Sequence, residues 1–286
     1  MKYKYAVLTI GLLLFFTDKS SAQESYLQIG GGYGFPTSST QAGENTTFAP
    51  NRLPIKTENV DSELGSGFSI MLRAGYMITT NVGADIGLNY LIGNRVNLSR
   101  QRLGDETFIM TGQARQARLN PAIVFSTGTQ NVLSAYSRVG LVLPLGGVTI
   151  IEYNIPSMFS QSGNSEVEVE EIRGRFGIGF SGTLGAQYEI YPRTHIFTEV
   201  EAIHLGIRRR SAKTTTFRVD GQDALAGLTT FSRETNFVNE LNNLSNNPDL
   251  NPTIDQDAPY EALTSTTFFN SIGVNIGIRY RIFRYL

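Results

Sequence analysis

Residues 68–78 read FSIMLRAGYMI and alternate between two kinds of side chain. One face carries only apolar and aromatic side chains, those of Phe68, Ile70, Leu72, Ala74, Tyr76 and Ile78. The other face carries Ser69, Met71, Arg73, Gly75 and Met77. A period of two sustained over about 11 residues predicts a β-strand. A tilted strand needs about that length to cross a bilayer.

The same alternation returns along the rest of the chain. Residues 82–92 repeat it directly after a short turn. Further alternating stretches cover residues 116–125, 133–143, 173–190 and 272–282, and less regular ones cover residues 26–35 and 196–208. Together they predict eight strands, an even number as in single-chain membrane barrels.

Residues 196–208 leave the direction of one group of side chains open. The apolar trio Ile203, Leu205 and Ile207 has the same parity as Glu199 and Glu201. Either a bulge near residue 202 exchanges the two faces of the strand, or the trio lies inside the barrel together with the glutamates.

The connections between the alternating stretches are strongly unequal. Tight turns occupy residues 79–81, 127–131 and 191–193, whereas long polar loops occupy residues 36–65, 94–112, 146–171 and 209–265. Short turns on one side and long loops on the other are typical of a membrane barrel. A soluble β-sandwich usually has strands of about five or six residues, and a soluble lipocalin-like barrel would keep its apolar face inside.

The sequence therefore predicts an all-β fold, an antiparallel up-and-down transmembrane β-barrel of eight strands with short periplasmic turns and long extracellular loops. A hairpin hidden in the last loop would raise the strand number to ten. Strand-like residues 148–153 and 167–172 predict that the barrel wall continues above the membrane.

The N-terminus has the pattern of an export signal. Lys2 and Lys4 precede an apolar run over residues 6–16, and the small residues Ser20, Ser21 and Ala22 follow it. This run is too short for a membrane-spanning helix, which takes roughly 20 residues. We expect residues 1–22 to be a signal peptide cleaved near Ala22, and residues 23–286 to form a single barrel domain.

Composition limits the classes of function. The chain has no Cys, which excludes disulfides and an acylated cysteine. Its formal net charge of −1 gives no electrostatic signature for nucleic acid. No pattern indicates a cofactor.

The C-terminal strand carries a motif that resembles the signal read by the barrel-assembly machinery: Asn275, Gly277, Tyr280 and Ile282. The chain departs from the usual pattern because it continues to Leu286 without a terminal Phe. With the strand and loop pattern, the whole mature chain resembles the small outer-membrane β-barrels of Gram-negative bacteria, the porin-like family of the OmpX, OmpW and OmpA-barrel type. This resemblance implies a location in the cell outer membrane among lipid and lipopolysaccharide, and contact with the assembly machinery during biogenesis.

The inward face of the predicted strands is rich in charge. The candidate luminal network comprises Arg73, Asp85, Arg118, Arg138, Arg173, Arg175, Glu189, Glu199, Glu201, Arg279 and Arg281. An eight-stranded barrel is just wide enough for side chains to fill, and unpaired buried charges are costly. Two hypotheses follow: a salt-bridged plug, or an anion-preferring conduit lined by the surplus arginines.

Catalysis and metal binding have little support in the sequence. The only histidines are His195, beside a periplasmic turn, and His204, which lacks the Ser two residues later that a lipid A deacylase resemblance would require. Residues 242–249 and 255–257 are rich in Asn and Asp but do not have the spacing of an EF-hand loop. We therefore predict no catalytic residue, no metal and no cofactor.

The long loops carry the candidate contacts with partners. The last loop contains apolar residues at helical spacing, which predicts a short surface helix: Phe237, Val238, Leu241 and Leu244. The run Arg208, Arg209 and Arg210 lies at the predicted outer membrane edge, where it could meet lipopolysaccharide phosphates. An extracellular ligand or protein could bind the loops.

Three functions remain open at this point. The first is a non-enzymatic structural or interaction role at the surface, with a side-chain-filled lumen. The second is passive, porin-like or OmpW-like transport of small solutes. The third is an accessory barrel of a secretion or assembly machine.

Overall fold

The structure, a computed structural model, describes residues 24–37, 41–61, 63–128 and 132–284. The predicted signal peptide and its cleavage point near Ala22 lie outside the described residues, as do parts of the turn at residues 127–131.

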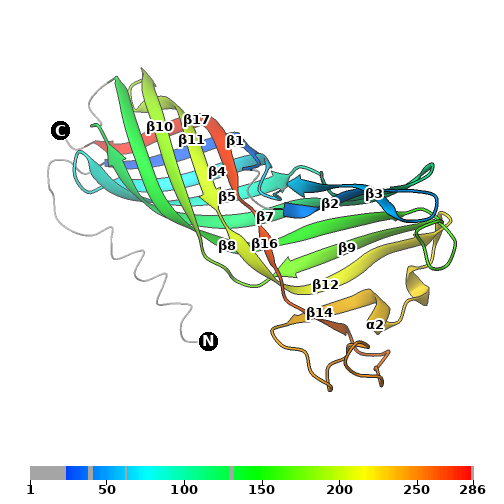
Figure 1. The fold of residues 1–286 in the computed structure, drawn as a ribbon. Coiled ribbons are helices and arrows are strands. Elements are labelled where there is room, and N and C mark those ends of the chain that lie inside the picture. The colour runs from blue at the N-terminus through cyan, green and yellow to red at the C-terminus, as the bar shows by residue number, and fades with distance from the viewer. Residues whose placement is uncertain (1–23, 38–40, 62, 129–131, 285–286) are drawn as a thin grey trace.

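Eight antiparallel strands close into a barrel (Figure 1). They are β1 (Glu24–Phe35), β4 (Gly67–Met77), β5 (Val82–Gly93), β7 (Glu106–Ser126), β8 (Leu133–Ile155), β10 (Gly179–Tyr191), β11 (Thr194–His204) and β17 (Ser271–Arg284). Each pairs with the next, and β17 pairs with β1 to complete the circle. The predicted eight-stranded up-and-down barrel is thus confirmed.

The barrel wall places its apolar face outward. Leu72 is 51% exposed, whereas Met71 and Arg73 on either side of it are 2% and 4% exposed. The same alternation runs along β5, β10, β11 and β17. So large an apolar surface would be unfavourable in water, so the wall must be covered by lipid.

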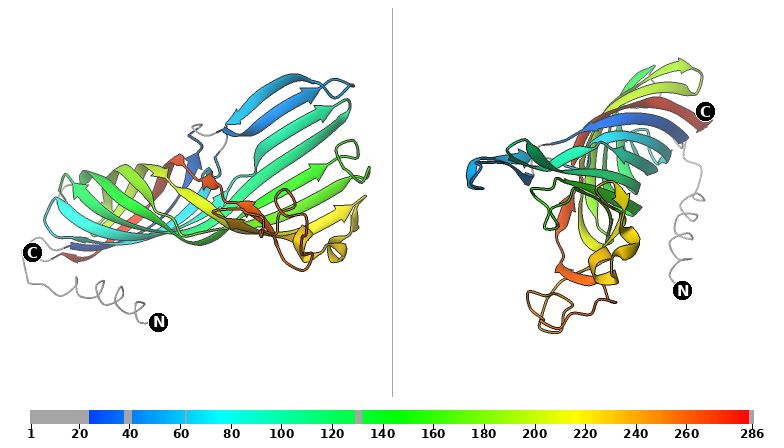
Figure 2. Two further views of the ribbon diagram at one scale, coloured as in Figure 1. Left: turned by 60° about the horizontal axis from the view of Figure 1, so that its bottom comes forward. Right: turned by 90° about the vertical axis from the view of Figure 1, so that its right-hand side faces the viewer.

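A second sheet, here called the outer sheet, continues from one side of the barrel (Figures 1 and 2). Strands β7 and β8 are 21 and 23 residues long, and their outer halves form its centre. The remaining strands are β2 (Gln41–Phe48), β3 (Pro54–Asp61), β6 (Val96–Leu103), β9 (Glu166–Gly174), β12 (Gly206–Val219), β14 (Glu234–Val238) and β15 (Tyr260–Leu263). Their pairing gives the order β3-β2-β6-β7-β8-β9-β12-β14-β15.

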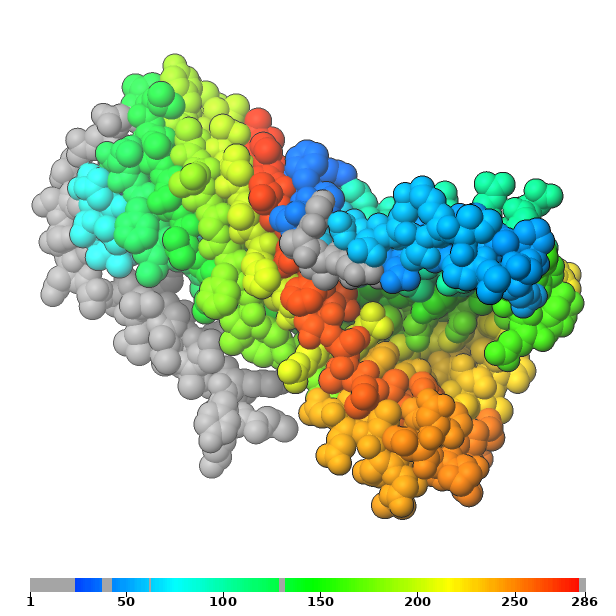
Figure 3. Space-filling view, viewed as in Figure 1, coloured from blue at the N-terminus to red at the C-terminus, as the bar shows by residue number. Residues whose placement is uncertain are grey.

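Much of what the sequence suggested as loop is therefore strand. The continuation of the wall predicted at residues 148–153 and 167–172 is confirmed, since these residues pair in the β8–β9 ladder. Two pairs in the outer sheet, β2–β6 and β14–β15, are parallel. Short strands β13 (Gln222–Asp223) and β16 (Thr266–Phe268) also pair with β12. The outer sheet and the last loop stand well beyond the barrel (Figure 3).

The helix predicted in the last loop is wrong. Phe237 and Val238 end β14, which pairs in parallel with β15, and the following residues form turns. The side chain of Asn246 holds these turns, because its Nδ2 donates to the carbonyls of Asp255, Ala258 and Pro259 at 2.9, 3.1 and 3.0 Å. The loop's helices are the short η1 (Leu225–Gly227) and α2 (Thr230–Arg233). Across the described residues, no helix has the length and apolar character to cross a membrane.

Candidate functional site

The centre of the barrel lumen is occupied by a network of paired charges, here called the luminal network. Arg138 on β8 is 2% exposed. Its Nη2 donates to Glu199 Oε2 on β11, and its Nε lies 3.5 Å from Asp85 Oδ2 on β5. Asp85 also accepts hydrogen bonds from Arg73 Nη1 and from the Tyr26 hydroxyl, both at 3.0 Å. One carboxylate therefore connects strands β1, β4, β5 and β8.

Glu199 makes the matching connection on the opposite wall. It accepts from the Tyr136 hydroxyl at 2.7 Å and from Asn275 Nδ2 at 3.2 Å. Asn275 also donates to Glu201 Oε2 at 3.2 Å, and Glu201 Oε1 lies 3.5 Å from Arg73 Nη2. The chain of contacts thus crosses the lumen and returns to Arg73.

Arg279 is held by amides and aromatic rings. Its guanidinium carbon lies 4.4 Å from the centre of the Tyr26 ring and 4.5 Å from that of Tyr136. Its Nη2 donates to Gln28 Oε1 at 2.8 Å and its Nη1 to Gln187 Oε1 at 2.5 Å. Stacking between two rings is a favourable environment for a planar guanidinium.

Two inward-facing glycines make room for these rings. A Cβ on Gly75 would lie 2.2 Å from Tyr26 Cζ, and one on Gly185 would lie 2.5 Å from Tyr136 Cζ. Both distances are far below van der Waals contact, so an alanine at either position would displace the ring. The glycines on the inward faces of β4 and β10 are thus part of the luminal packing.

Other predicted members lie away from the centre of the network. Arg118 donates through Nε to Gln116 Oε1 at 2.5 Å, and it lines with Glu201 a cavity of about 20 Å³. That volume holds about one water molecule.

At the periplasmic end, Arg281 Nε lies 2.7 Å from Glu24 Oε1. Glu189 is half-buried beside the turn, where it accepts from the Arg193 amide at 3.3 Å and lies 3.9 Å from Nε2 of the buried His195.

Arg173 and Arg175 are not in the lumen, contrary to the expectation from their parity. Arg173 is exposed at the end of β9, and Arg175 donates to the Phe237 carbonyl at 2.7 Å above the barrel. The physical reason is that residues 173–190 are two strands. The chain leaves the outer sheet at Gly174 and enters the barrel wall only at Gly179, so the alternation of the barrel strand does not extend to the arginines.

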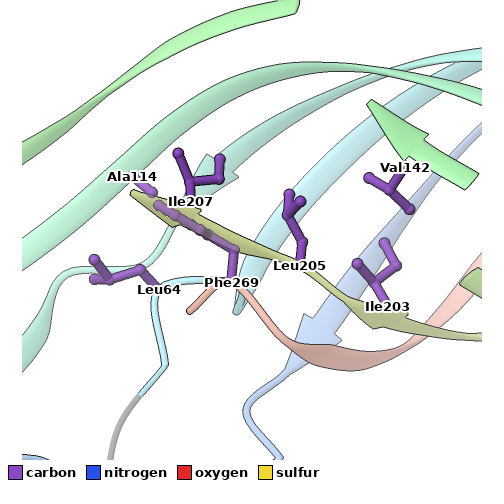
Figure 4. Packing of buried hydrophobic residues seen from close by; sticks show 7 residues of the cluster. All are labelled: Leu64, Ala114, Val142, Ile203, Leu205, Ile207 and Phe269. Carbon is purple, nitrogen blue, oxygen red and sulfur yellow. The ribbon is translucent and has the colours of Figure 1, made fainter. Parts of the chain in front are cut away.

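A cluster of buried apolar residues, here called the mouth cluster, packs between the strands at the outer end of the lumen (Figure 4). This mouth cluster consists of Leu64, Ala114, Val142, Ile203, Leu205, Ile207 and Phe269. The β10–β11 register runs without interruption from His195 to His204, so there is no bulge near residue 202. Ile203, Leu205 and Ile207 are all buried, so the trio lies inside. Of the two alternatives left open by the sequence, the inward apolar trio is correct.

Two segments outside the barrel strands complete the mouth cluster and are fastened there. Leu64 and Phe269 enter from the connections before β4 and β17. Buried Asn270 donates to Glu63 Oε1 at 2.8 Å and accepts from the Leu205 amide at 3.0 Å. The Phe269 amide donates to the Leu205 carbonyl at 2.8 Å. The loops therefore fold into the mouth as bonded parts of the structure.

The sequence could have indicated more of the network than its charges. Tyr26, Gln28, Tyr136 and Gln187 share the inward parity of the charged residues on their strands, and each contacts one of the buried arginines. The alternation of inward and outward positions along each strand therefore predicts that these residues face the lumen. A search for charged residues alone does not find them.

The remaining predicted residues are placed as follows. In the proposed assembly motif, Asn275 faces the lumen and Tyr280 is 47% exposed on the outer wall; Gly277 lies between them and Ile282 is half-buried. Their role in assembly stays a prediction.

His204 is exposed, with its ring 6.3 Å from that of Phe268. Within the described ranges, no group of three or more His, Cys, Asp or Glu could hold a metal ion.

Comparison with known proteins agrees with this geometry. The family model described as "Outer membrane protein beta-barrel domain" matches residues 7–228. The chain belongs to this outer-membrane β-barrel family. No curated protein matches its sequence.

Three solved structures are similar to this chain at low sequence identity. Neisserial surface protein A (NspA) has a TM-score of 0.37 and 9% identity, covering 93% of this chain and 100% of that chain. A major outer membrane protein from Thermus thermophilus has a TM-score of 0.46 and 11% identity, covering 91% and 100%. Ail, the attachment invasion locus protein of Yersinia pestis, has a TM-score of 0.36 and 12% identity, covering 91% and 99%.

Proposed function

We propose that this outer-membrane barrel is a non-enzymatic, non-conducting scaffold that holds the outer sheet at the cell surface for contacts with other molecules. The observation that carries the proposal is the filling of the lumen by two layers in series. The luminal network crosses the middle of the barrel, and the mouth cluster closes its outer end.

The chemistry of the two layers favours a closed channel. Ions would have to separate buried pairs such as Arg138–Glu199 and Arg73–Asp85, and breaking a buried pair costs several kcal/mol. They would then meet the wholly apolar side chains of the mouth cluster, which offer an ion no hydration. Passive solute transport through the lumen would require both layers to move.

The outer sheet supports the surface role. It is built on the same two strands, β7 and β8, that cross the barrel, so it is continuous with the wall. Its edge strand β3 is almost entirely exposed and has no pairing on its outer side within the described residues. An exposed strand edge can pair with an added strand of another protein.

Recording from planar bilayers tests the closed lumen. Residues 23–286 are refolded, inserted, and checked for insertion by protease protection of the barrel. We expect no current steps over a range of salt. Steady, ion-selective steps from the inserted protein would overturn the proposal and favour a porin.

The surface role needs a separate test, because the absence of a current would not show whether the outer sheet contacts other molecules. Cells that display the wild-type protein are compared with cells that display a variant in which a short turn replaces residues 41–61, the edge hairpin of the outer sheet. We expect the variant to lose cell–cell aggregation or adhesion to coated surfaces. Unchanged adhesion on every surface tested would count against the outer sheet as the contact region.

A further inference from the structure

A slot interrupts the barrel wall between β8 and the chain that runs from β9 to β10. The β8–β10 ladder ends at the pair Val142 and Gly179, and the β8–β9 ladder begins at the pair Thr149 and Ile172. Residues 143–148 and 173–178 have no strand pairing with each other across this interval. Residues 144–148 and 173–176 of these segments line a cavity of about 850 Å³, here called the wall cavity.

The two sides of the slot are held apart by their other neighbours. On one side, β8 remains paired with β7 past this level, to Val148 and beyond. On the other, the Arg175 amide donates to the Arg208 carbonyl at 2.8 Å, which keeps this segment against β12. The slot is therefore fixed by the strand pairing around it.

The lining of the wall cavity is strongly basic. Its charged residues are Arg115, Arg173, Arg175, Arg209 and Arg210, against a single carboxylate, Glu171. Two of the arginines are held by the protein: Arg175 donates to the Phe237 carbonyl, and Arg209 donates to Thr267 Oγ1 at 3.3 Å. In the part of the chain that the structure describes, the side chains of the other three make no hydrogen bond or ion pair, so their donors are available to an anion.

The same cavity has an apolar rim that faces lipid. Leu145 and Phe176 line it and are 59% and 71% exposed. Below them the outward face continues with Ile178 and Phe180, which are also exposed apolar residues of the wall. Basic groups above an exposed apolar surface complement an amphiphile with an anionic head and an acyl tail.

We propose that the wall cavity binds a phosphate-bearing lipid of the outer leaflet. The phosphate lies among the arginines, because guanidinium groups bind phosphate through paired, charge-assisted hydrogen bonds. The acyl chain lies along Leu145 and Phe176. The lipid stays in the wall, because Ile207 and Phe269 of the mouth cluster form the inner lining of the cavity. Strands of the outer sheet line this site, but it is distinct from the exposed edge strand β3 proposed above for contacts with other proteins.

The test measures binding to the purified full chain in a mild detergent by native mass spectrometry. The probes are dioleoyl phosphatidic acid, dioleoylglycerol, which has the same tails without phosphate, and inorganic phosphate. We expect phosphatidic acid to bind more tightly than either of the others. The triple variant Arg115→Gln, Arg173→Gln and Arg210→Gln should weaken its binding by roughly tenfold or more, since each basic group near an anionic lipid surface contributes substantially.

A matched triple variant controls for the loss of net charge: Lys56→Gln, Arg100→Gln and Arg218→Gln remove three exposed charges elsewhere on the outer sheet. It should bind phosphatidic acid like the wild type. If the first triple variant does not fold, the single change Arg210→Glu replaces it.

Three results would overturn the proposal. Equal binding of phosphatidic acid by both triple variants would show that the cavity arginines are not involved. Dioleoylglycerol binding as tightly as phosphatidic acid would remove the role of phosphate. Inorganic phosphate binding as tightly as the lipid would indicate an ion site, and Phe176→Ser would then leave phosphatidic acid binding unchanged.

Discussion

At the scale of single residues, the barrel interior depends on a few shared acceptors. Glu199 accepts from Arg138, Tyr136 and Asn275, and Asp85 accepts from Arg73 and Tyr26. A buried ion pair is not strongly stabilising compared with apolar packing, but the loss of one partner leaves an uncompensated charge. The stability of the barrel should therefore respond sharply to changes at these acceptors.

Glu199→Gln tests that dependence. The amide keeps the shape of the side chain but removes the charge that balances Arg138, so we expect a loss of about 3 kcal/mol in the free energy of unfolding. Urea titration of the refolded protein in lipid vesicles measures it. Glu58→Gln, at an exposed ion pair with Lys56, is the control and should change stability by less than about 0.5 kcal/mol. Equal effects of the two changes would mean that the network does not bear on stability.

Gly185→Ala tests the space beneath the Tyr136 ring. The added Cβ would lie 2.5 Å from Tyr136 Cζ, so the ring must move away from Arg279, at a cost of about 1–3 kcal/mol. Gly182 lies on the same strand, where an added Cβ would have no neighbouring atom within 4 Å, and Gly182→Ala should be neutral. The comparison uses the same urea titration. If Gly182→Ala is as destabilising, strand flexibility and not ring displacement explains the effect.

At the scale of elements, the sequence predicted the strands that cross the membrane and missed most of the outer sheet. The barrel strands face lipid on one side and a packed lumen on the other, which gives them a period of two that can be read from residues 68–78 alone. Strands such as β3 are exposed on both faces, so their sequence PIKTENVD has no apolar period. Among the described residues β3 pairs only with the preceding strand β2, and it is β2 that pairs with a strand distant in sequence, β6.

The errors at the site have a related cause. The alternation that predicts a luminal position for Arg173 and Arg175 belongs to a strand that begins only at Gly179. The alternation of inward and outward side chains continues along one strand but not across a break between two strands. In the local sequence, only the glycines mark this break. Asn246, whose amide organises the last loop, contacts residues 9 to 13 positions away, which a search for helical spacing does not detect.

The β8–β9 ladder of the outer sheet should be sensitive to pH. Burial raises the pKa of Glu170, the nearby Glu168 raises it further, and Arg209 partly offsets both. Because the folded pKa lies above the unfolded value, the stabilising contribution of neutral Glu170 is present at low pH and is lost as pH rises through the folded pKa. We expect amide hydrogen exchange in this ladder, corrected for intrinsic rates, to be slower at mildly acidic than at neutral pH.

Glu170→Gln should remove that dependence and slow exchange at neutral pH. Glu171→Gln, on the opposite face of the same strand, is the control and should leave the dependence in place. If both variants retain the wild-type pH profile, Glu170 is not the titrating group.

At the scale of the whole molecule, the closed lumen that we propose rests on two layers in series that are built differently. The luminal network joins strands through charge pairs, whereas the mouth cluster depends on the apolar trio of residues 203, 205 and 207 and on two inserted loop residues. Either layer alone should block ions. A current is therefore expected only when both the luminal network and the mouth cluster are opened. Removing both partners of a charge pair tests this expectation without leaving a buried charge unpaired.

The test uses two sets of substitutions, singly and combined, in planar bilayers. Arg138→Ser with Glu199→Ser removes a charge pair as a unit, and Leu205→Ser with Phe269→Ser opens the mouth cluster. Each set alone should leave the barrel silent, although the second removes large buried apolar side chains and should lower stability by several kcal/mol. The combined variant should give steady current steps. Current from the mouth variant alone would mean that the luminal network does not stop ions, and the closed state would then depend on the mouth cluster.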